Sequence, residues 1–94
     1  MYNTARVVKR ITSGKTLCID IVVGNDGRIV ELIVSGDFFV YPEEAIEAIE
    51  EKARGCLIDE LIGFIKELEF TPIGFSKEDL VRAVVEAYRR AINK

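Results

Sequence analysis

Hydrophobic and polar residues alternate along the first half of the chain. In residues 16–24, one side of the segment carries only apolar side chains: Leu17, Ile19, Ile21 and Val23. This period of two is typical of a half-buried β-strand, and residues 28–35 repeat it through Val30, Leu32 and Val34. Asn25-Asp26-Gly27 between the two segments suits a tight turn, so together they predict a β-hairpin. Residues 6–11 predict a shorter strand, which the loop Thr12-Ser13-Gly14-Lys15 connects to the hairpin.

The hydrophobic spacing changes to that of helices after residue 41. Pro42 suits a first helical turn, where its missing N–H would be unpaired, and it predicts a helix to about residue 54. Residues 57–69 predict a second helix, in which Gly63 implies close packing against a neighbouring element. Ser76-Lys77-Glu78-Asp79 resembles a capping box and predicts the start of a third helix. On the first helix, three acidic residues are expected to face water: Glu47, Glu50 and Glu51.

The order of strands followed by helices predicts an α+β fold. We expect a three-stranded antiparallel sheet in the N-terminal half, covered on one face by about three C-terminal helices, with the other face partly open. At 94 residues, the chain is predicted to be one domain spanning 1–94, with room for one modest core but hardly for a deep catalytic cavity as well.

Charge and composition narrow the function classes. The chain carries 13 basic and 16 acidic residues and a formal net charge of −3, unlike the strongly basic balance of a dedicated nucleic-acid binder. No stretch is long and apolar enough for a membrane span, and the N-terminus lacks the apolar core of a signal peptide, so we expect no membrane association and a cytoplasmic location. Residues 1–19 nevertheless hold four basic residues and no acidic one, which predicts a cationic patch at one end of the sheet: Arg6, Lys9, Arg10 and Lys15.

The two cysteines, Cys18 and Cys56, lie far apart in a chain that has no histidine. Neither a Cys/His metal site nor a Cys–His nucleophile is therefore expected, and no metal is predicted. Apolar neighbours and a reducing cytosol favour two core-lining thiols over a disulfide.

Residues 34–42 are the most informative part of the chain. Four large apolar residues run consecutively from position 38 to position 41, and a strand cannot bury all of them on one face. Either Phe38 and Tyr41 or Phe39 and Val40 would fill the core at the corner between sheet and helix. Part of this set is expected to be exposed.

This region, Ser35-Gly36-Asp37-Phe38-Phe39, resembles the small C-terminal domain of lipoate-protein ligases. The similarity continues through Ser13-Gly14-Lys15 and through residues 25–29, 41–46, 54–55 and 76–80. In most bacterial members of that family the domain follows a larger catalytic domain, whereas in some archaeal systems it is a separate polypeptide that pairs with a catalytic subunit. Because this sequence begins with Met1 and contains no catalytic domain, the resemblance implies a stand-alone accessory subunit.

The resemblance also implies a two-step reaction. The assembled enzyme uses ATP, magnesium and lipoate to form lipoyl-AMP with loss of pyrophosphate, and then transfers the lipoyl group to a lysine of an acceptor domain. The expected partner is the catalytic large subunit, in a heterodimer, and lipoyl-acceptor domains are partners indirectly. The accessory domain is needed chiefly for adenylation, so this chain is expected to supply no catalytic residue and to bind no cofactor itself.

Two groups of residues are candidates for roles in such an enzyme. Gly14 and Lys15 match the Gly-Lys pattern of the family, and Lys15 would place a cation near the adenylate; a purely solvated loop charge is the open alternative. Asp37 would either accept hydrogen bonds in the turn after Gly36 or lie at the subunit interface. The aromatic residues are predicted to anchor the catalytic subunit: Phe38, Phe39 and Tyr41.

Two other interpretations remain open. A small sheet covered by helices also resembles adaptor proteins of iron–sulfur assembly, although two separated cysteines give no ligand spacing for a cluster. The second is a non-enzymatic module that binds an unrelated protein through residues 38–41. Arg89 and Arg90 are interpreted as the solvated end of the third helix rather than as a phosphate site.

Overall fold

The computed structural model describes residues 2–11 and 13–93. Three strands form an antiparallel sheet in their order along the chain: β1 (Asn3–Arg10), β2 (Thr16–Val23) and β3 (Ile29–Gly36). The predicted hairpin and the first strand are confirmed, although β1 begins at Asn3 rather than at position 6. Thr12 of the predicted loop lies outside the described residues.

The start of β3 differs from the prediction. Val23 pairs with Ile29, but Val22 pairs with Glu31, so β3 contains a bulge at Val30. Ile29 is consequently fully buried in the core, while Val30 is 39% exposed. The predicted alternation through Val30 is wrong, because one extra residue in a strand exchanges the faces on which its side chains lie.

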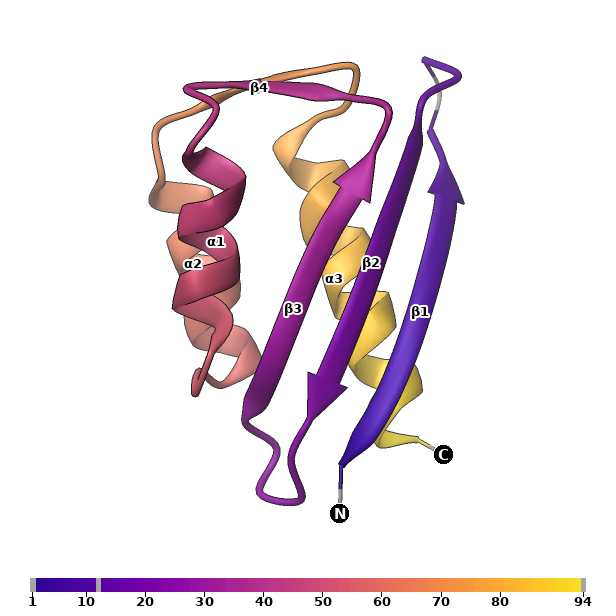
Figure 1. Cartoon of the computed structure of the whole chain (residues 1–94), viewed down its shortest axis with the longest axis vertical. Helices are drawn as coiled ribbons and strands as arrows, with labels where there is room; N and C mark the ends of the chain where they lie inside the picture. Colours follow the sequence, from indigo (N-terminus) through magenta and orange to yellow (C-terminus); the bar gives the residue numbers. More distant parts are fainter. Residues whose placement is uncertain (1, 12, 94) are drawn as a thin grey trace.

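Three helices cover one face of this sheet. α3 (Lys77–Ile92) packs on β1 and β2, and α1 (Ala45–Ala53) packs against β3. α2 (Ile58–Glu67) contacts α1 and α3. In Figure 1, α3 lies behind the sheet, and α1 and α2 lie to the left of β3. Between sheet and helices lies a core of fully buried side chains that include Ile19, Leu61 and Leu80. The predicted α+β fold is therefore confirmed.

The helices begin close to their predicted positions. α1 begins at Ala45, and Pro42 lies before the helix, where its carbonyl accepts the N–H of Ala45 at 3.1 Å. α3 opens with the predicted capping box. The Ser76 hydroxyl accepts the N–H of Asp79 at 3.0 Å, and the Asp79 carboxylate accepts the N–H of Ser76 at 2.9 Å. This pair satisfies two backbone donors at the start of α3.

Two helix residues differ from the prediction. Glu50, expected to face water, is half-buried, and its carboxylate accepts the N–H of Val34 in the edge strand β3 at 2.8 Å. It is turned toward the sheet because an edge strand leaves such backbone donors unpaired. Gly63 is exposed, and no atom of a neighbouring element lies within 4 Å of the position that a β-carbon would take. The predicted close packing at Gly63 is wrong, because that face of α2 points to solvent.

A second small sheet, which the sequence did not predict, closes one end of the molecule. β4 (Phe39–Tyr41) pairs antiparallel with β5 (Thr71–Ile73), which follows α2 in the chain. Strands of three residues are too short to show a period of two, and Pro72 within β5 argues against a strand. The turn between β1 and β2 and the start of α3 lie at the same end (Figure 1), which we call the β4–β5 end.

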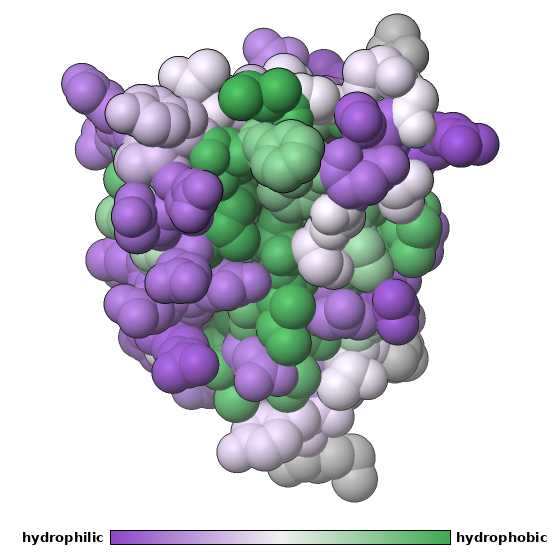
Figure 2. Space-filling view, turned by 45° about the horizontal axis from the view of Figure 1, so that its top comes forward, coloured by the Kyte–Doolittle hydropathy of each residue, from purple (hydrophilic) through white to green (hydrophobic). Residues whose placement is uncertain are grey.

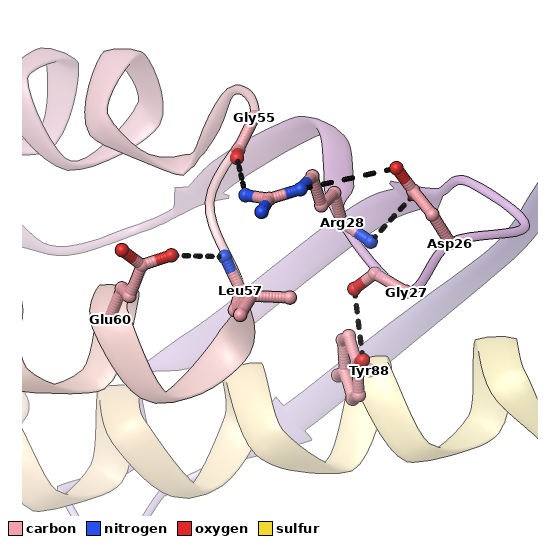
Figure 3. A network of polar contacts seen from close by, with 7 residues as sticks. All are labelled: Asp26, Gly27, Arg28, Gly55, Leu57, Glu60 and Tyr88. Carbon is pink, nitrogen blue, oxygen red and sulfur yellow. Dashed lines mark hydrogen bonds and ion pairs between the residues drawn. The ribbon is translucent and has the colours of Figure 1, made fainter.

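A polar network fixes the other end of the sheet to the helices (Figure 3). Arg28 follows the hairpin turn and donates to the carbonyl of Gly55 at 2.9 Å. Tyr88 of α3 donates its hydroxyl to the carbonyl of Gly27 in the turn itself at 3.0 Å. The hairpin is thereby held against both the connection between α1 and α2 and the C-terminal half of α3.

Cys18 and Cys56 are buried and are not bonded to each other, which confirms the prediction of two buried thiols. None of the helices in residues 2–11 and 13–93 has the length and apolar character needed to cross a membrane. Within the same residues, no three or more His, Cys, Asp or Glu side chains are grouped so that they could hold a metal ion.

Candidate functional site

The residues singled out from the sequence come from two distant segments that meet at the β4–β5 end. The turn between β1 and β2 carries one group, and the end of β3 together with β4 carries the other (Figure 1). The loop between β5 and α3 lies between them and contacts both groups. The full set is Gly14, Lys15, Gly36, Asp37, Phe38, Phe39 and Tyr41.

Lys15 is positioned by contacts between its turn and the loop after β5. Gly14 has a φ of 87°, and its N–H donates to the carbonyl of Ile11 at 2.8 Å, which closes the turn. The Ser13 hydroxyl donates to the carbonyl of Gly74 at 2.6 Å. The aliphatic stem of Lys15 lies against the same glycine, since a β-carbon on Gly74 would be only 3.0 Å from Lys15 Cγ. The stem is thus supported while the residue stays exposed to solvent.

Gly36 and Asp37 join the end of β3 to the start of β2. A β-carbon on Gly36, whose φ is 151°, would lie 2.1 Å from the Thr16 carbonyl oxygen, so only glycine fits. The Asp37 carboxylate accepts the N–H of Thr16 at 2.6 Å. This hydrogen bond, together with the charges of Lys15 and Arg10, holds the pKa of Asp37 below its ordinary value. Asp37 is therefore an acceptor that joins the end of β3 to the start of β2, and its place at the subunit interface stays a prediction.

The four apolar residues before the first helix divide according to the alternation of β4. Phe38 and Val40 turn inward, and the Phe38 ring meets Phe75 edge-on with the ring centroids 4.6 Å apart. Phe39 and Tyr41 point outward and are 71% and 72% exposed. Neither predicted pairing is correct, because residues two apart in a strand share a face.

Ile73 of β5 extends the exposed face of β4. It pairs with Phe39 across the small sheet and is 53% exposed, so Phe39, Tyr41 and Ile73 form what we call the aromatic surface. Figure 2, in which this end is turned toward the viewer, shows apolar side chains that continue as a band down the visible face between hydrophilic flanks. Val8 and Ile33, on the uncovered face of the larger sheet, are exposed as well. Exposed apolar area of this kind is typical of a contact site for another protein.

Sequence reasoning missed the contribution of Ile73 and Gly74. The local signal was ambiguous: Pro72 biases the preceding Thr71 toward extended backbone, but a proline within the segment also argues against a strand. The completed site offers a supported cation and an apolar surface, while its carboxylate, Asp37, is engaged with backbone.

No model of a known protein family matches the chain. Its sequence is 34% identical over 88 residues to lipoate-protein ligase A subunit 2 of Thermoplasma acidophilum, a match that covers 89% of this chain and 87% of that protein. Among solved structures it is similar to a chain from an archaeal lipoylation system of the same organism, described as a bi-partite lipoate protein ligase and its E2 lipoyl domain. That match has a TM-score of 0.72 and 24% identity, covers 89% of this chain and 94% of the other, and supports the fold.

Proposed function

The chain belongs to the family of lipoate-protein ligase A subunit 2, and we propose that it is the accessory subunit of a two-part lipoate-protein ligase. With a separate catalytic subunit, it is required for the ATP-dependent activation of lipoate to lipoyl-AMP. Transfer of the lipoyl group to a lysine of an acceptor protein follows. The chain supplies no catalytic residue, and the assembled enzyme binds ATP, magnesium and lipoate.

The aromatic surface is the observation that carries this proposal. Phe39 and Tyr41 are both more than two-thirds exposed, although aromatic side chains are most often found in cores or in the centres of interfaces. Burial of these two side chains would remove on the order of 200–300 Å² from water, a driving force of about 5–7 kcal/mol before the costs of association. The catalytic subunit therefore docks at the β4–β5 end.

Lys15 gives the docked subunit a cation. It lies against Gly74, the residue that follows Ile73 of the aromatic surface, so a subunit that covers this surface comes close to Lys15. Formation of the adenylate increases negative charge on the α-phosphate and on the departing pyrophosphate. A supported ammonium group stabilises that charge at little cost in conformational entropy.

The alternative assignments are less well supported. Cys18 and Cys56 are both buried, one in β2 and the other after α1, an arrangement that offers no cluster-ligand set for an iron–sulfur adaptor. A generic interaction module would use the same aromatic surface, but the sequence relative over most of the chain is a ligase subunit.

The test is the lipoate-dependent exchange between ATP and pyrophosphate, measured with the catalytic subunit of the same organism in the presence and absence of this chain. We expect exchange only when both are present. Phe39→Ser should weaken the complex at least about tenfold, because it removes an aromatic anchor. Tyr2→Ser is the matched control, since Tyr2 is 65% exposed but precedes β1 at the other end of the sheet. If the chain neither binds the catalytic subunit nor changes exchange, the proposal fails.

Lys15→Ala separates catalysis from assembly. We expect exchange to slow by about 10- to 100-fold with unchanged complex affinity, because the variant lacks the cation that acts on developing charge. Lys15→Arg should retain most of the rate, and Lys66→Ala, a loss of the same charge on α2, should retain all of it. If Lys15→Ala exchanges at the wild-type rate, Lys15 is only a solvated loop charge. The assignment of the interface would not be affected by that result.

A further inference from the structure

The Ser13 hydroxyl joins two segments that lie 61 residues apart in the chain, the turn between β1 and β2 and the loop between β5 and α3. It donates to the carbonyl of Gly74 at 2.6 Å, although Ser13 is exposed to solvent. An exposed hydroxyl can bond to water instead, so a protein partner at this distance shows that the turn is seated against the loop. Gly74 is also the residue against which the stem of Lys15 lies. Ser13 and Lys15 therefore contact the same point of the loop.

The loop is fixed on both sides of Gly74. Before it, Ile73 is paired with Phe39 in the small sheet. After it, Phe75 is buried and packs edge-on against Phe38. Gly74 itself has a φ of 97°, a conformation that glycine adopts without strain. Because its neighbours are held by a strand and by the core, the Gly74 carbonyl is a rigid anchor for the Ser13 hydroxyl.

The turn that carries Lys15 has backbone bonds of its own. The Ile11 N–H donates to the Lys15 carbonyl at 2.9 Å. Asp37 accepts the N–H of Thr16, the residue after Lys15. These bonds shape the turn, but their partners belong to the ends of β1, β2 and β3, so they do not set the distance between the turn and the loop after β5. The Ser13 hydroxyl spans that distance.

We propose that Ser13 is a positioning residue for Lys15, a proposal that rests on the function assigned above. Its hydroxyl holds the turn against the loop, which keeps the stem of Lys15 on Gly74 and restricts the positions that the ammonium group can take. A cation that is already oriented loses less conformational entropy when it acts on the charge that develops during adenylation. Without the hydroxyl, the turn still closes but stands away from the loop in a larger share of molecules. Ser13 thus acts through Lys15 and not on the substrate.

Exchange between ATP and pyrophosphate by the complete two-subunit enzyme tests this role. We expect Ser13→Ala to lower the maximal exchange rate by about 3- to 10-fold, the change in population that the loss of one hydrogen bond allows, with the KM for ATP and the affinity between subunits unchanged. Ser13→Thr keeps a hydroxyl and should keep most of the rate. Tyr88→Phe is the matched control, because it removes a hydroxyl bond to the carbonyl of Gly27 in the hairpin turn at the other end of the sheet. Its exchange rate should equal that of wild type.

The double variant Ser13→Ala with Lys15→Ala distinguishes a positioning role from a merely structural one. If Ser13 acts through Lys15, the double variant should exchange at the rate of Lys15→Ala alone. A further decrease in that background overturns the proposal, and so does an unchanged rate in Ser13→Ala or in Lys15→Ala. A weaker complex of Ser13→Ala also overturns it, since Ser13 would then belong to the subunit interface. Absence of exchange in the wild-type assembly would instead overturn the proposed function.

Discussion

Gly36→Ala tests the junction that holds the two parts of the candidate site together. The added β-carbon would lie 2.1 Å from the Thr16 carbonyl oxygen and 2.9 Å from two ring carbons of Phe38. Comfortable separations between such atoms are about 3.5 Å, so the backbone must move by more than about 1 Å to admit the methyl group. Gly36 is paired with Leu17 in the ladder, and the movement therefore separates the end of β3 from the start of β2.

The expected loss of stability follows from this geometry. A residue with a side chain held at a φ of 151° costs about 1–3 kcal/mol, and each backbone hydrogen bond given up at the junction adds about 0.5–1.5 kcal/mol. The free energy of unfolding should fall by about 2–4 kcal/mol, a large share of the 5–15 kcal/mol that is typical of a domain. For a domain of this size, Tm should drop by about 10–25 °C.

Thermal and urea unfolding followed by circular dichroism measure this loss, with Gly63→Ala as the matched control. The same methyl group on Gly63 meets no neighbouring atom within 4 Å, so the control should gain about 0.5–1 kcal/mol from higher helix propensity. At a temperature where Gly36→Ala is folded, we also expect slower ATP–pyrophosphate exchange, because Lys15 and the aromatic surface lose their common support. If the free energy of unfolding of Gly36→Ala lies within about 0.5 kcal/mol of the wild-type value, the steric reasoning is refuted.

Three further predictions concern the framework around the site. Because Lys9 holds the pKa of Glu86 below its ordinary value, stability from this pair is complete above the usual glutamate pKa of about 4.3 and is lost as pH falls through the lower folded-state pKa. As pH falls, the urea midpoint of wild type should thus decline more steeply than that of Glu86→Gln. Identical declines would show that the Lys9–Glu86 pair does not contribute to stability. Tyr88→Phe removes the hydroxyl donated to the Gly27 carbonyl and should lower the free energy of unfolding in urea by about 0.5–1.5 kcal/mol. Ser76→Ala should lower the free energy of unfolding in urea by about 1 kcal/mol, because it removes the side-chain cap of α3. Ser76→Asp should retain most of the wild-type stability, since aspartate can cap the helix as well.

The parts of the fold that the sequence predicted correctly depend on residues near one another in the chain. The capping box of α3 lies within four residues, and its two hydrogen bonds are local. The hairpin turn between β2 and β3 is likewise local. The bulge in β3 is different, because Ile29 and Val30 are adjacent and both apolar, so either could occupy the core position. The choice between them depends on how they pair with Val22 and Val23 on β2.

The candidate site was predicted only in part, because it is assembled from three separated segments. Residues 13–15, 36–41 and 73–75 meet through hydrogen bonds and packing that no local pattern reports. The sequence identified the first two segments by their resemblance to a family, but β5 has no such signal. Without β5, the alternation of β4 could not be assigned, and the inward and outward aromatic side chains could not be distinguished.

This assembly explains how docking and chemistry would be coupled in the proposed enzyme. Ile73 belongs to the aromatic surface, and the next residue, Gly74, accepts the Ser13 hydroxyl and supports the stem of Lys15. A partner that buries Ile73 and Phe39 therefore restrains the same loop that positions the lysine. Binding energy gained on an apolar surface would reduce the mobility of a cation a few residues away, which is a way for a subunit without catalytic residues to accelerate adenylation.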